Sequence, residues 1–193
     1  MRNYWAALSK ETSMKTTLFM AVSANGFVAR KDGDEDFLPH EGWLQMLDFA
    51  KKYGHLIWGR KTYEAVSGWG GNFMKDLQHI PFIIVSNSKK SSYPQNVTVC
   101  SSPTEALKAV ELMGQKTAFL SGGPTLNTAF VKAGLVDEII LNYNPTILAN
   151  GIKLFAESDF ELRLKLDEVK ELSSGIVQIR YSVINSLTDK SAQ

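Results

Sequence analysis

The chain has 193 residues, of which 44% are hydrophobic and 21% are charged, and its formal net charge is +1. This length predicts one domain with a real core, and the small net charge excludes a broad nucleic-acid surface. The single cysteine, Cys100, excludes an internal disulfide framework and a cysteine-based zinc site. The early apolar run from Leu18 to Val22 is too short to span a membrane. We therefore expect a cytoplasmic protein with no metal and with no nucleic-acid or membrane partner.

The chain divides into one domain and two short ends. Residues 1–13 are mostly polar and show no strand or helix period, so they are predicted to be a flexible N-terminal extension. The first strand pattern begins at Met14, which could also be the true start of the protein. Residues 14–186 are predicted to form the domain, and residues 187–193 a flexible tail.

Strands alternate with helices over the first three quarters of the domain. The strand-like segments are 16–23, 55–58, 81–86, 97–100, 117–120 and 136–143. The helix-like segments are 39–53, 60–67, 103–113 and 124–133. Ser102 is predicted to cap the third helix, with Pro103 and Glu105 in its first turn.

The C-terminal part has a different pattern. Residues 162–166 and 177–181 alternate strictly between apolar and polar, and Ser173-Ser174-Gly175 lies between them. This indicates an antiparallel hairpin with one solvated face. The whole order predicts a three-layer α/β fold, in which a mostly parallel twisted sheet has helices on both faces and carries this hairpin. Ligands of such sheets bind beyond the carboxyl ends of the strands.

The segment from Phe119 to Leu126 reads as a strand, a tight turn at Gly122-Gly123 and a helix that starts at Pro124. Adjacent glycines let the backbone approach a ligand closely. A helix start offers free N–H groups that suit a phosphate. The same pattern can also be a plain corner, so by itself it leaves both interpretations open.

Two other strand ends carry similar chemistry. Gly59, Arg60, Lys61 and Thr62 follow a strand and enter a helix, which suits phosphate binding but is equally typical of an ordinary helix start. Ser86 and Asn87 follow the next strand and precede Lys89 and Lys90, which suits a ribose phosphate or a solvated loop. None of the three has the glycine spacing of a Rossmann or Walker motif. Together they predict a nucleotide site of another design.

These motifs resemble those of a known superfamily. The segment 19–29, FMAVSANGFVA, looks like the first-strand motif of the dihydrofolate reductase superfamily, and segment 59–64, GRKTYE, is similar to another of its motifs. Segments 122–126 and 134–138 resemble the version found in the reductase half of the riboflavin-biosynthesis deaminase–reductase, the RibD C-terminal domain family. The resemblance covers about residues 14–184 and implies a dihydrofolate-reductase-like fold.

The resemblance implies NADPH as the cofactor. Ala21 and Val28 would flank the nicotinamide, and Gly59, Arg60, Lys61 and Thr62 would hold phosphates of the adenosine half. Ser86 and Asn87 would face the ribose and its 2′-phosphate. The pyrophosphate would be wrapped by the glycine turn and the helix start that follows it: Gly122, Gly123, Pro124, Thr125 and Leu126. Arg60 is our candidate for choosing NADPH over NADH, because a guanidinium matches phosphate geometry.

The catalytic and substrate residues form a second set of candidates. The riboflavin-type reductases usually carry Asp-Gly where this chain has Asn25-Gly26, and an amide cannot carry the same charge. Glu41 is the acid that lies nearest the place where dihydrofolate reductases have one, although an acid also suits a helix start. Ser23, Trp58 and Tyr143 are candidates for contact with the substrate, and the aromatic pair could equally be core.

The resulting functional hypothesis is an NADPH-dependent reductase of a pyrimidine- or pterin-like heterocycle. It would resemble the 5-amino-6-(5-phosphoribosylamino)uracil reductase of riboflavin biosynthesis. Two alternatives remain, a dihydrofolate reductase and a nucleotide-binding module without catalysis. No deaminase half is present, because its zinc motif needs paired cysteines. The resemblance also implies a homodimer through the sheet edge or the C-terminal strands.

Overall fold

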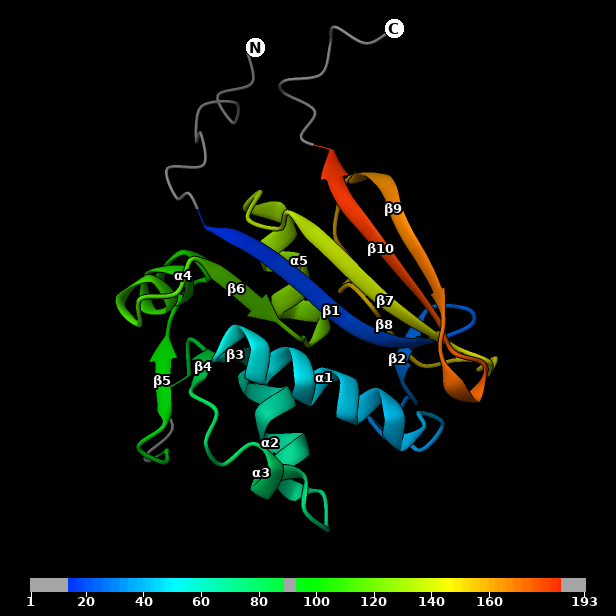
Figure 1. The fold of residues 1–193 in the computed structure, drawn as a ribbon, viewed down its shortest axis with the longest axis horizontal. Helices are drawn as coiled ribbons and strands as arrows, with labels where there is room; N and C mark the ends of the chain where they lie inside the picture. The colour runs from blue at the N-terminus through cyan, green and yellow to red at the C-terminus, as the bar shows by residue number, and fades with distance from the viewer. Residues whose placement is uncertain (1–13, 89–92, 185–193) are drawn as a thin grey trace, which may run out of the picture.

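The computed structural model describes residues 14–88 and 93–184, which form an eight-stranded sheet with helices on both faces (Figure 1). The predicted extension 1–13, the tail 187–193 and the pair Lys89 and Lys90 lie outside the described residues. The strands of the main sheet are β1 (Lys15–Ser23), β3 (Leu56–Gly59), β4 (Phe82–Val85), β5 (Val97–Cys100), β6 (Thr117–Leu120), β7 (Glu138–Asn144), β9 (Arg163–Glu171) and β10 (Val177–Ile184).

The strand order is β5-β4-β3-β6-β1-β7-β10-β9. The pairs from β5 to β7 are all parallel, whereas β10 is antiparallel to both β7 and β9. A separate small sheet joins β2 (Phe27–Ala29) to β8 (Ile152–Lys153). The predicted fold class is confirmed, including the antiparallel C-terminal hairpin.

Helix α1 (His40–Tyr53) covers one face of the sheet. Its apolar side chains recur at helical spacing, so Met46, Leu47 and Ala50 are buried in a cluster with Phe19 of β1. The helix ends at Gly54, whose φ of 75° closes the last turn. The shorter helices α2 (Arg60–Gly68) and α3 (Phe73–Asp76) pack into the same cluster. The sequence did not predict α3.

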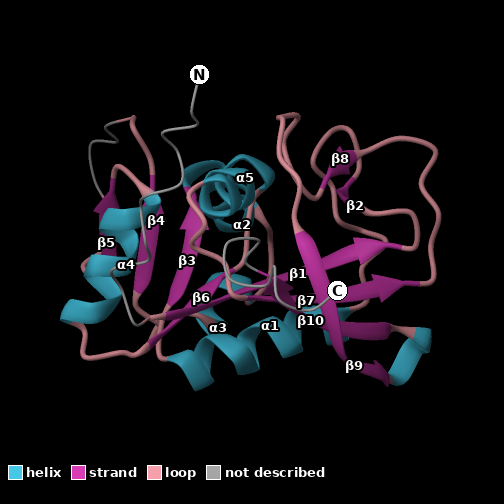
Figure 2. Ribbon diagram, turned by 90° about the horizontal axis from the view of Figure 1, so that it is seen from above, coloured by secondary structure: helices cyan, strands magenta, loops and turns pink. Residues whose placement is uncertain are grey.

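Helices α4 (Pro103–Leu112) and α5 (Pro124–Lys132) cover the opposite face, so that α1 and α5 lie on either side of the sheet (Figure 2). Ser102 caps α4 as predicted, since its Oγ accepts a hydrogen bond from the Glu105 backbone N–H. The Glu105 carboxylate in turn accepts from the Ser101 N–H. Phe130 of α5 is completely buried against the sheet.

A buried histidine joins two central strands. β3 and β6 share only one residue pair, Ile57 and Leu120, in their ladder. His55, which is fully buried, extends the connection because its Nε2 accepts a hydrogen bond from the Phe119 N–H at 3.1 Å. Its Nδ1 lies 3.0 Å from the carbonyl oxygen of Tyr53, so the neutral ring carries its proton there.

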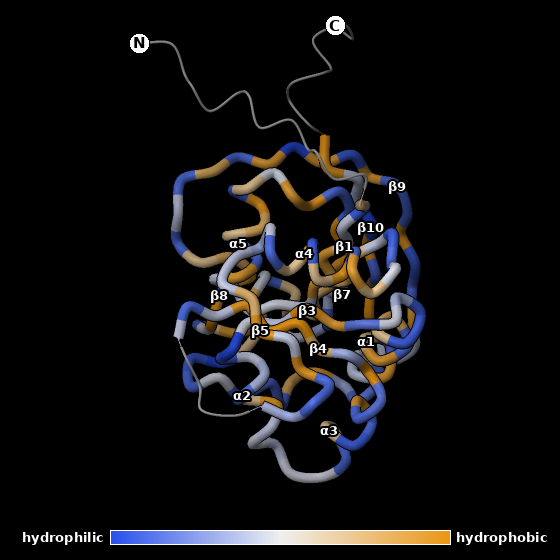
Figure 3. Tube along the Cα trace, turned by 90° about the vertical axis from the view of Figure 1, so that its left-hand side faces the viewer, coloured by the Kyte–Doolittle hydropathy of each residue, from blue (hydrophilic) through white to orange (hydrophobic). Residues whose placement is uncertain are grey.

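The apolar side chains of the edge strand β9 are more exposed than the sequence predicted. A hairpin with one solvated face should bury its apolar side chains, yet Leu164, Leu166 and Val169 are 38%, 54% and 54% exposed. The apolar residues of the central strands gather inside the molecule, whereas those of β9 lie at its margin (Figure 3). The alternating pattern therefore creates an apolar face that no described helix covers. Among the described residues, no helix is long and apolar enough to cross a membrane.

Candidate active site

The three strand ends with phosphate-suited chemistry are neighbours in the sheet. β4, β3 and β6 are adjacent and parallel, and β1 follows β6. Consequently their carboxyl ends lie side by side at the same end of the sheet. Ser86, Gly59 and the Gly122-Gly123 turn are found there, with the end of β1 beside them. The sequence placed these residues at strand ends, and the topology brings them together.

The glycine turn fits tightly against the start of α2. Its Gly122–Gly123 peptide is cis, and the Gly59 N–H donates to the Gly122 carbonyl at 2.8 Å. A Cβ on Gly123 would lie 2.8 Å from Thr62 Oγ1, and one on Gly122 would lie 3.0 Å from Met20 Sδ. The turn thus lies close to both α2 and β1, and a larger residue at either position would require Thr62 or Met20 to move.

Two helices begin at this turn without side-chain caps. The N-cap residues are Gly59 for α2 and Gly123 for α5, and neither helix has an acidic residue in its first turn. Free N–H groups and the positive ends of two helix dipoles therefore meet at one place. Thr125 is exposed at the start of α5, whereas Leu126 is buried beneath it. This is the arrangement that binds phosphate in many proteins.

Arg60 is already engaged by an acid. Its Nη1 lies 2.6 Å from Glu64 Oε2, one turn along α2, and both side chains remain about one third exposed. Tyr93 lies near the pair, and its pKa is raised by burial and then by the Glu64 charge, while the Arg60 charge opposes this. Lys61 is exposed. A phosphate at Arg60 would share the guanidinium with Glu64.

Ser86 and Asn87 occupy the end of β4. Ser86 Oγ donates to the Ser88 carbonyl and accepts from the Ser88 N–H, which forms a compact turn. Asn87 is exposed. Ser86 and Asn87 therefore follow a strand that is adjacent to the one that leads to Arg60, and the hydrogen bonds of Ser86 stay within its own turn.

Asn25 and Ser23 organise the turn after β1. The Asn25 amide donates to the Leu148 carbonyl at 2.7 Å, and its Oδ1 accepts from the Leu148 N–H at 3.2 Å. Ser23 Oγ donates to the same Oδ1 and accepts from the Phe27 N–H. Both side chains thus hold the β1–β2 turn against the loop after β7, and Ser23 is fully buried.

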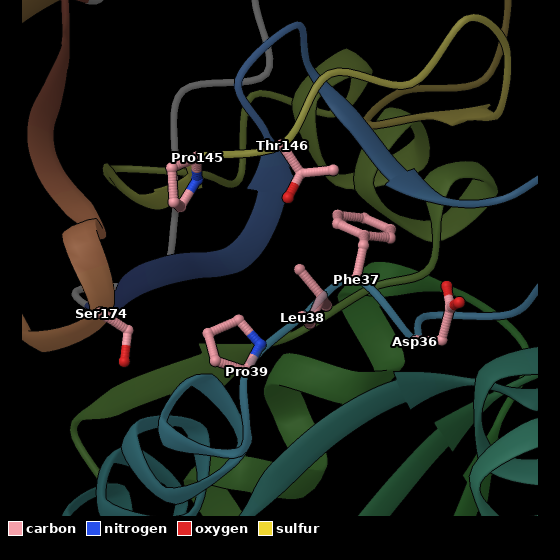
Figure 4. A pocket seen from close by; sticks show the side chains of 7 residues that line it. All are labelled: Asp36, Phe37, Leu38, Pro39, Pro145, Thr146 and Ser174. Atoms are coloured by element: carbon pink, nitrogen blue, oxygen red, sulfur yellow. The ribbon is translucent and has the colours of Figure 1, made fainter.

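A cavity of about 250 Å³ opens at the ends of β7 and of the β9–β10 hairpin (Figure 4). Three segments face one another across it: Asp36–Pro39 before α1, Pro145 and Thr146 after β7, and Ser174 in the hairpin turn. Beside it, Ser173 Oγ donates a short hydrogen bond to the Glu41 carboxylate. A second hollow, of about 480 Å³, is lined by Arg30, Lys31, Asp32 and Asn150.

Glu35 is a titratable residue that the sequence did not single out. It immediately precedes the cavity-lining segment, and burial, followed by the charge of Asp34, raises its pKa to about 7. It therefore holds a proton at neutral pH more readily than an ordinary carboxyl group. The run of acids around it resembles a solvated loop, and only the folded environment distinguishes Glu35.

The other residues predicted to bind the substrate or the nicotinamide do not lie together in one site. Trp58 is 2% exposed and packs on Phe82 in the cluster beneath α1, and Tyr143 packs against the clusters on the other face. Val28 is buried with Val22 and Ala29, whereas Ala21 is partly exposed at the end of β1. Ala21 lies near the end of β1, beside the strand that carries the glycine turn, and Trp58 precedes Gly59 but is buried. No group of three metal-binding side chains occurs among the residues described.

The mostly parallel sheet, the glycine turn between two helix starts and the antiparallel hairpin define an α/β domain with a candidate phosphate site at the carboxyl ends of its strands. Residues 14–178 match the model of the RibD C-terminal domain, and the chain belongs to that family. A relative of Bacillus subtilis, the uncharacterized protein YwjB, is 32% identical over 172 residues, which cover 86% of this chain and 97% of YwjB.

Solved structures share the fold. A pyrimidine reductase-like protein of Corynebacterium diphtheriae matches with a TM-score of 0.71 at 15% identity, covering 89% of this chain and 92% of that one. A diaminohydroxyphosphoribosylaminopyrimidine deaminase/5-amino-6-(5-phosphoribosylamino)uracil reductase of Thermotoga maritima matches with a TM-score of 0.69 at 15% identity. The match covers 89% of this chain but 57% of the Thermotoga protein.

Proposed function

We propose that the protein is an NADPH-dependent reductase of a flat pyrimidine- or pterin-like heterocycle. The observation that carries this proposal is the pair of uncapped helix starts joined at the Gly122-Gly123 turn. The residues fit a dinucleotide phosphate, because the turn has no side chains and the helix ends are positive. Membership of the RibD C-terminal domain family supports the same function, and so does the structural similarity to a pyrimidine reductase-like protein and to a 5-amino-6-(5-phosphoribosylamino)uracil reductase.

The line of strand ends has a suitable length for a dinucleotide. From β4 to β1 there are three strand spacings, or about 14 Å at roughly 4.8 Å each. Ser86, Asn87 and Arg60 would bind the adenosine end, while Thr62 and the glycine turn would bind the pyrophosphate. The nicotinamide would lie beside Ala21. The neighbouring 250 Å³ cavity at β7 and α1 would then hold the heterocycle.

Bound NADPH would supply a hydride to an electrophilic carbon of the heterocycle. The protein would fix the two rings side by side and keep water away from them. Glu35 would supply the proton, because it precedes the cavity-lining segment and its pKa is raised to about 7. Glu41 suits this role less, since its carboxylate is held by Ser173. A cytoplasmic setting would suit both the cofactor and the single buried cysteine.

The test is titration with NADPH and NADH of the wild type and of Arg60→Ala. We expect the variant to weaken NADPH binding about tenfold, or about 1.4 kcal/mol, with a smaller effect on NADH. The reason is that the guanidinium would contact the 2′-phosphate that only NADPH carries. Lys108→Ala removes an exposed charge on α4 and should change neither affinity. Absence of binding to both nucleotides, or an equal loss for both, would contradict the proposal.

A further inference from the structure

Four amide side chains belong to the elements whose flanking segments line the 250 Å³ cavity. We call Gln45, Asn142, Asn144 and Gln178 the amide cluster. They come from α1, β7 and β10, which are distant in sequence. No motif pointed to them, and the roles proposed above leave them unused.

Three of the amides bond to one another. Asn142 Nδ2 donates to Gln45 Oε1 at 2.7 Å, and Gln178 Nε2 donates to the same oxygen at 3.3 Å and to Asn142 Oδ1 at 2.9 Å. Asn142 is 0% exposed and Gln178 is 8% exposed. Both residues are in register with Ala21 of β1, where the nicotinamide is proposed to lie.

Gln45 leaves a donor free. Both hydrogen bonds within the cluster use its oxygen, and no described residue accepts from its Nε2. The side chain is partly exposed. It lies one turn of α1 beyond Glu41, so the two side chains share a face of the helix. The bonds to Asn142 and Gln178 fix the direction in which the amide presents its N–H groups.

Asn144 leaves an acceptor free. Its Nδ2 donates to two backbone carbonyls, those of Val22 at 3.0 Å and of Asn142 at 3.1 Å, so the orientation of the amide is fixed. Its Oδ1 is buried without a partner among the described residues. Leaving a buried acceptor without a partner is unfavourable. A ligand N–H would remove that cost.

Three of the segments that line the cavity are continuous in sequence with an element that carries a residue of the amide cluster. Pro39 precedes α1, which carries Gln45, and Pro145 follows Asn144 directly. Ser174 lies in the turn that leads into β10 and Gln178. The turn covers this end of β7, since a Cβ on Gly175 would lie 3.5 Å from Pro145 and Ser173 holds Glu41.

We infer that the amide cluster recognises the lactam edge of the heterocycle, that is, a ring N–H beside a carbonyl. The Gln45 N–H would donate to the carbonyl, and Asn144 Oδ1 would accept from the ring N–H. The four amides are neutral, so they suit a neutral polar edge better than a phosphate or a carboxylate. The inference rests on the proposed function for the position of the substrate, and it identifies the chemical group by which that substrate is selected.

The test compares aminouracil with its derivative in which both ring N–H groups are methylated. Binding of each is measured by calorimetry, with and without NADP⁺, so no turnover is needed. We expect the wild type to bind aminouracil at least tenfold more tightly than the methylated ring. Gln45→Met removes the donor at similar volume and should weaken aminouracil binding about tenfold. Gln115→Met is the matched control, because Gln115 lies by Gly54 at the far end of α1.

The outcomes separate the two proposals. A wild type that binds both rings equally, or a wild type that binds NADPH but neither ring, overturns the inference. The same is true if Gln45→Met lowers the melting temperature but keeps the wild-type affinity for aminouracil, since Gln45 would then be only structural. Selective aminouracil binding that depends on Gln45, in a protein that oxidises no NADPH, would support the inference while the proposed function failed.

Discussion

At the scale of single residues, His55 makes stability depend on pH. Burial lowers its pKa from 6.5 to about 4, although the hydrogen bond to Tyr53 works in the opposite direction. As pH falls below about 6.5, the unfolded chain takes up a proton on this residue and the folded protein does not. The free energy of unfolding should therefore fall from about pH 6.5 to about pH 4.

Urea unfolding at pH 7 and pH 5 checks this for the wild type and His55→Gln. We expect the wild type to lose about 2 kcal/mol more than the variant between these values. Glu35 has a raised pKa and acts with the opposite sign, since its cost grows as pH rises towards 7. That contribution is common to both proteins. Equal losses in the two proteins would show that His55 does not cause the fall in the free energy of unfolding at acid pH.

At the scale of elements, the contact between the glycine turn and α2 is the central feature. In Gly123→Ala the added Cβ would meet Thr62 Oγ1 at 2.8 Å, so either the Thr62 side chain must rotate or the two segments must separate. We expect a loss of about 1–3 kcal/mol in stability, measured by denaturant unfolding, and weaker NADPH binding. Gly68→Ala is the control, because its Cβ would meet nothing within 4 Å.

A double variant shows whether the contact with Thr62 causes the loss of stability in Gly123→Ala. Thr62→Ala removes the opposing atom, so Gly123→Ala should cost less in that background than in the wild type. Additive losses would mean that the backbone of the turn, and not contact with Thr62, explains the sensitivity of Gly123.

At the scale of the whole molecule, the exposed apolar face of β9 is a surface that a partner could bury. An edge strand with free backbone groups and Leu164, Leu166 and Val169 outward is a surface on which a second copy can pack. We expect a homodimer, and Leu166→Asp should convert it to a monomer in light scattering at micromolar concentration. Lys165→Asp, on the opposite side of the strand, should remain dimeric. A monomeric wild type would exclude this expectation.

The fold and the strand ends proposed to bind the cofactor were largely predictable, because local sequence patterns determine where these strands end and helices begin. Strand, Gly-Gly and Pro124 in succession predicted the turn and the start of α5, and both are observed. The amide cluster was not predictable, since Asn142 and Gln45 are 97 residues apart and meet only through the topology. The raised pKa of Glu35 depends on burial, and the exposure of β9 depends on its edge position. Neither can be read from alternating residues alone.

The most direct measurement is the oxidation of NADPH by the purified protein with aminouracils, dihydropterins and dihydrofolate offered in turn. The account predicts oxidation that depends on one of these heterocycles and yields an equal amount of its reduced product. Oxidation with dihydrofolate alone would favour the dihydrofolate reductase alternative. Tight NADPH binding with no oxidation by any of them would contradict the reductase assignment and leave a nucleotide-binding module.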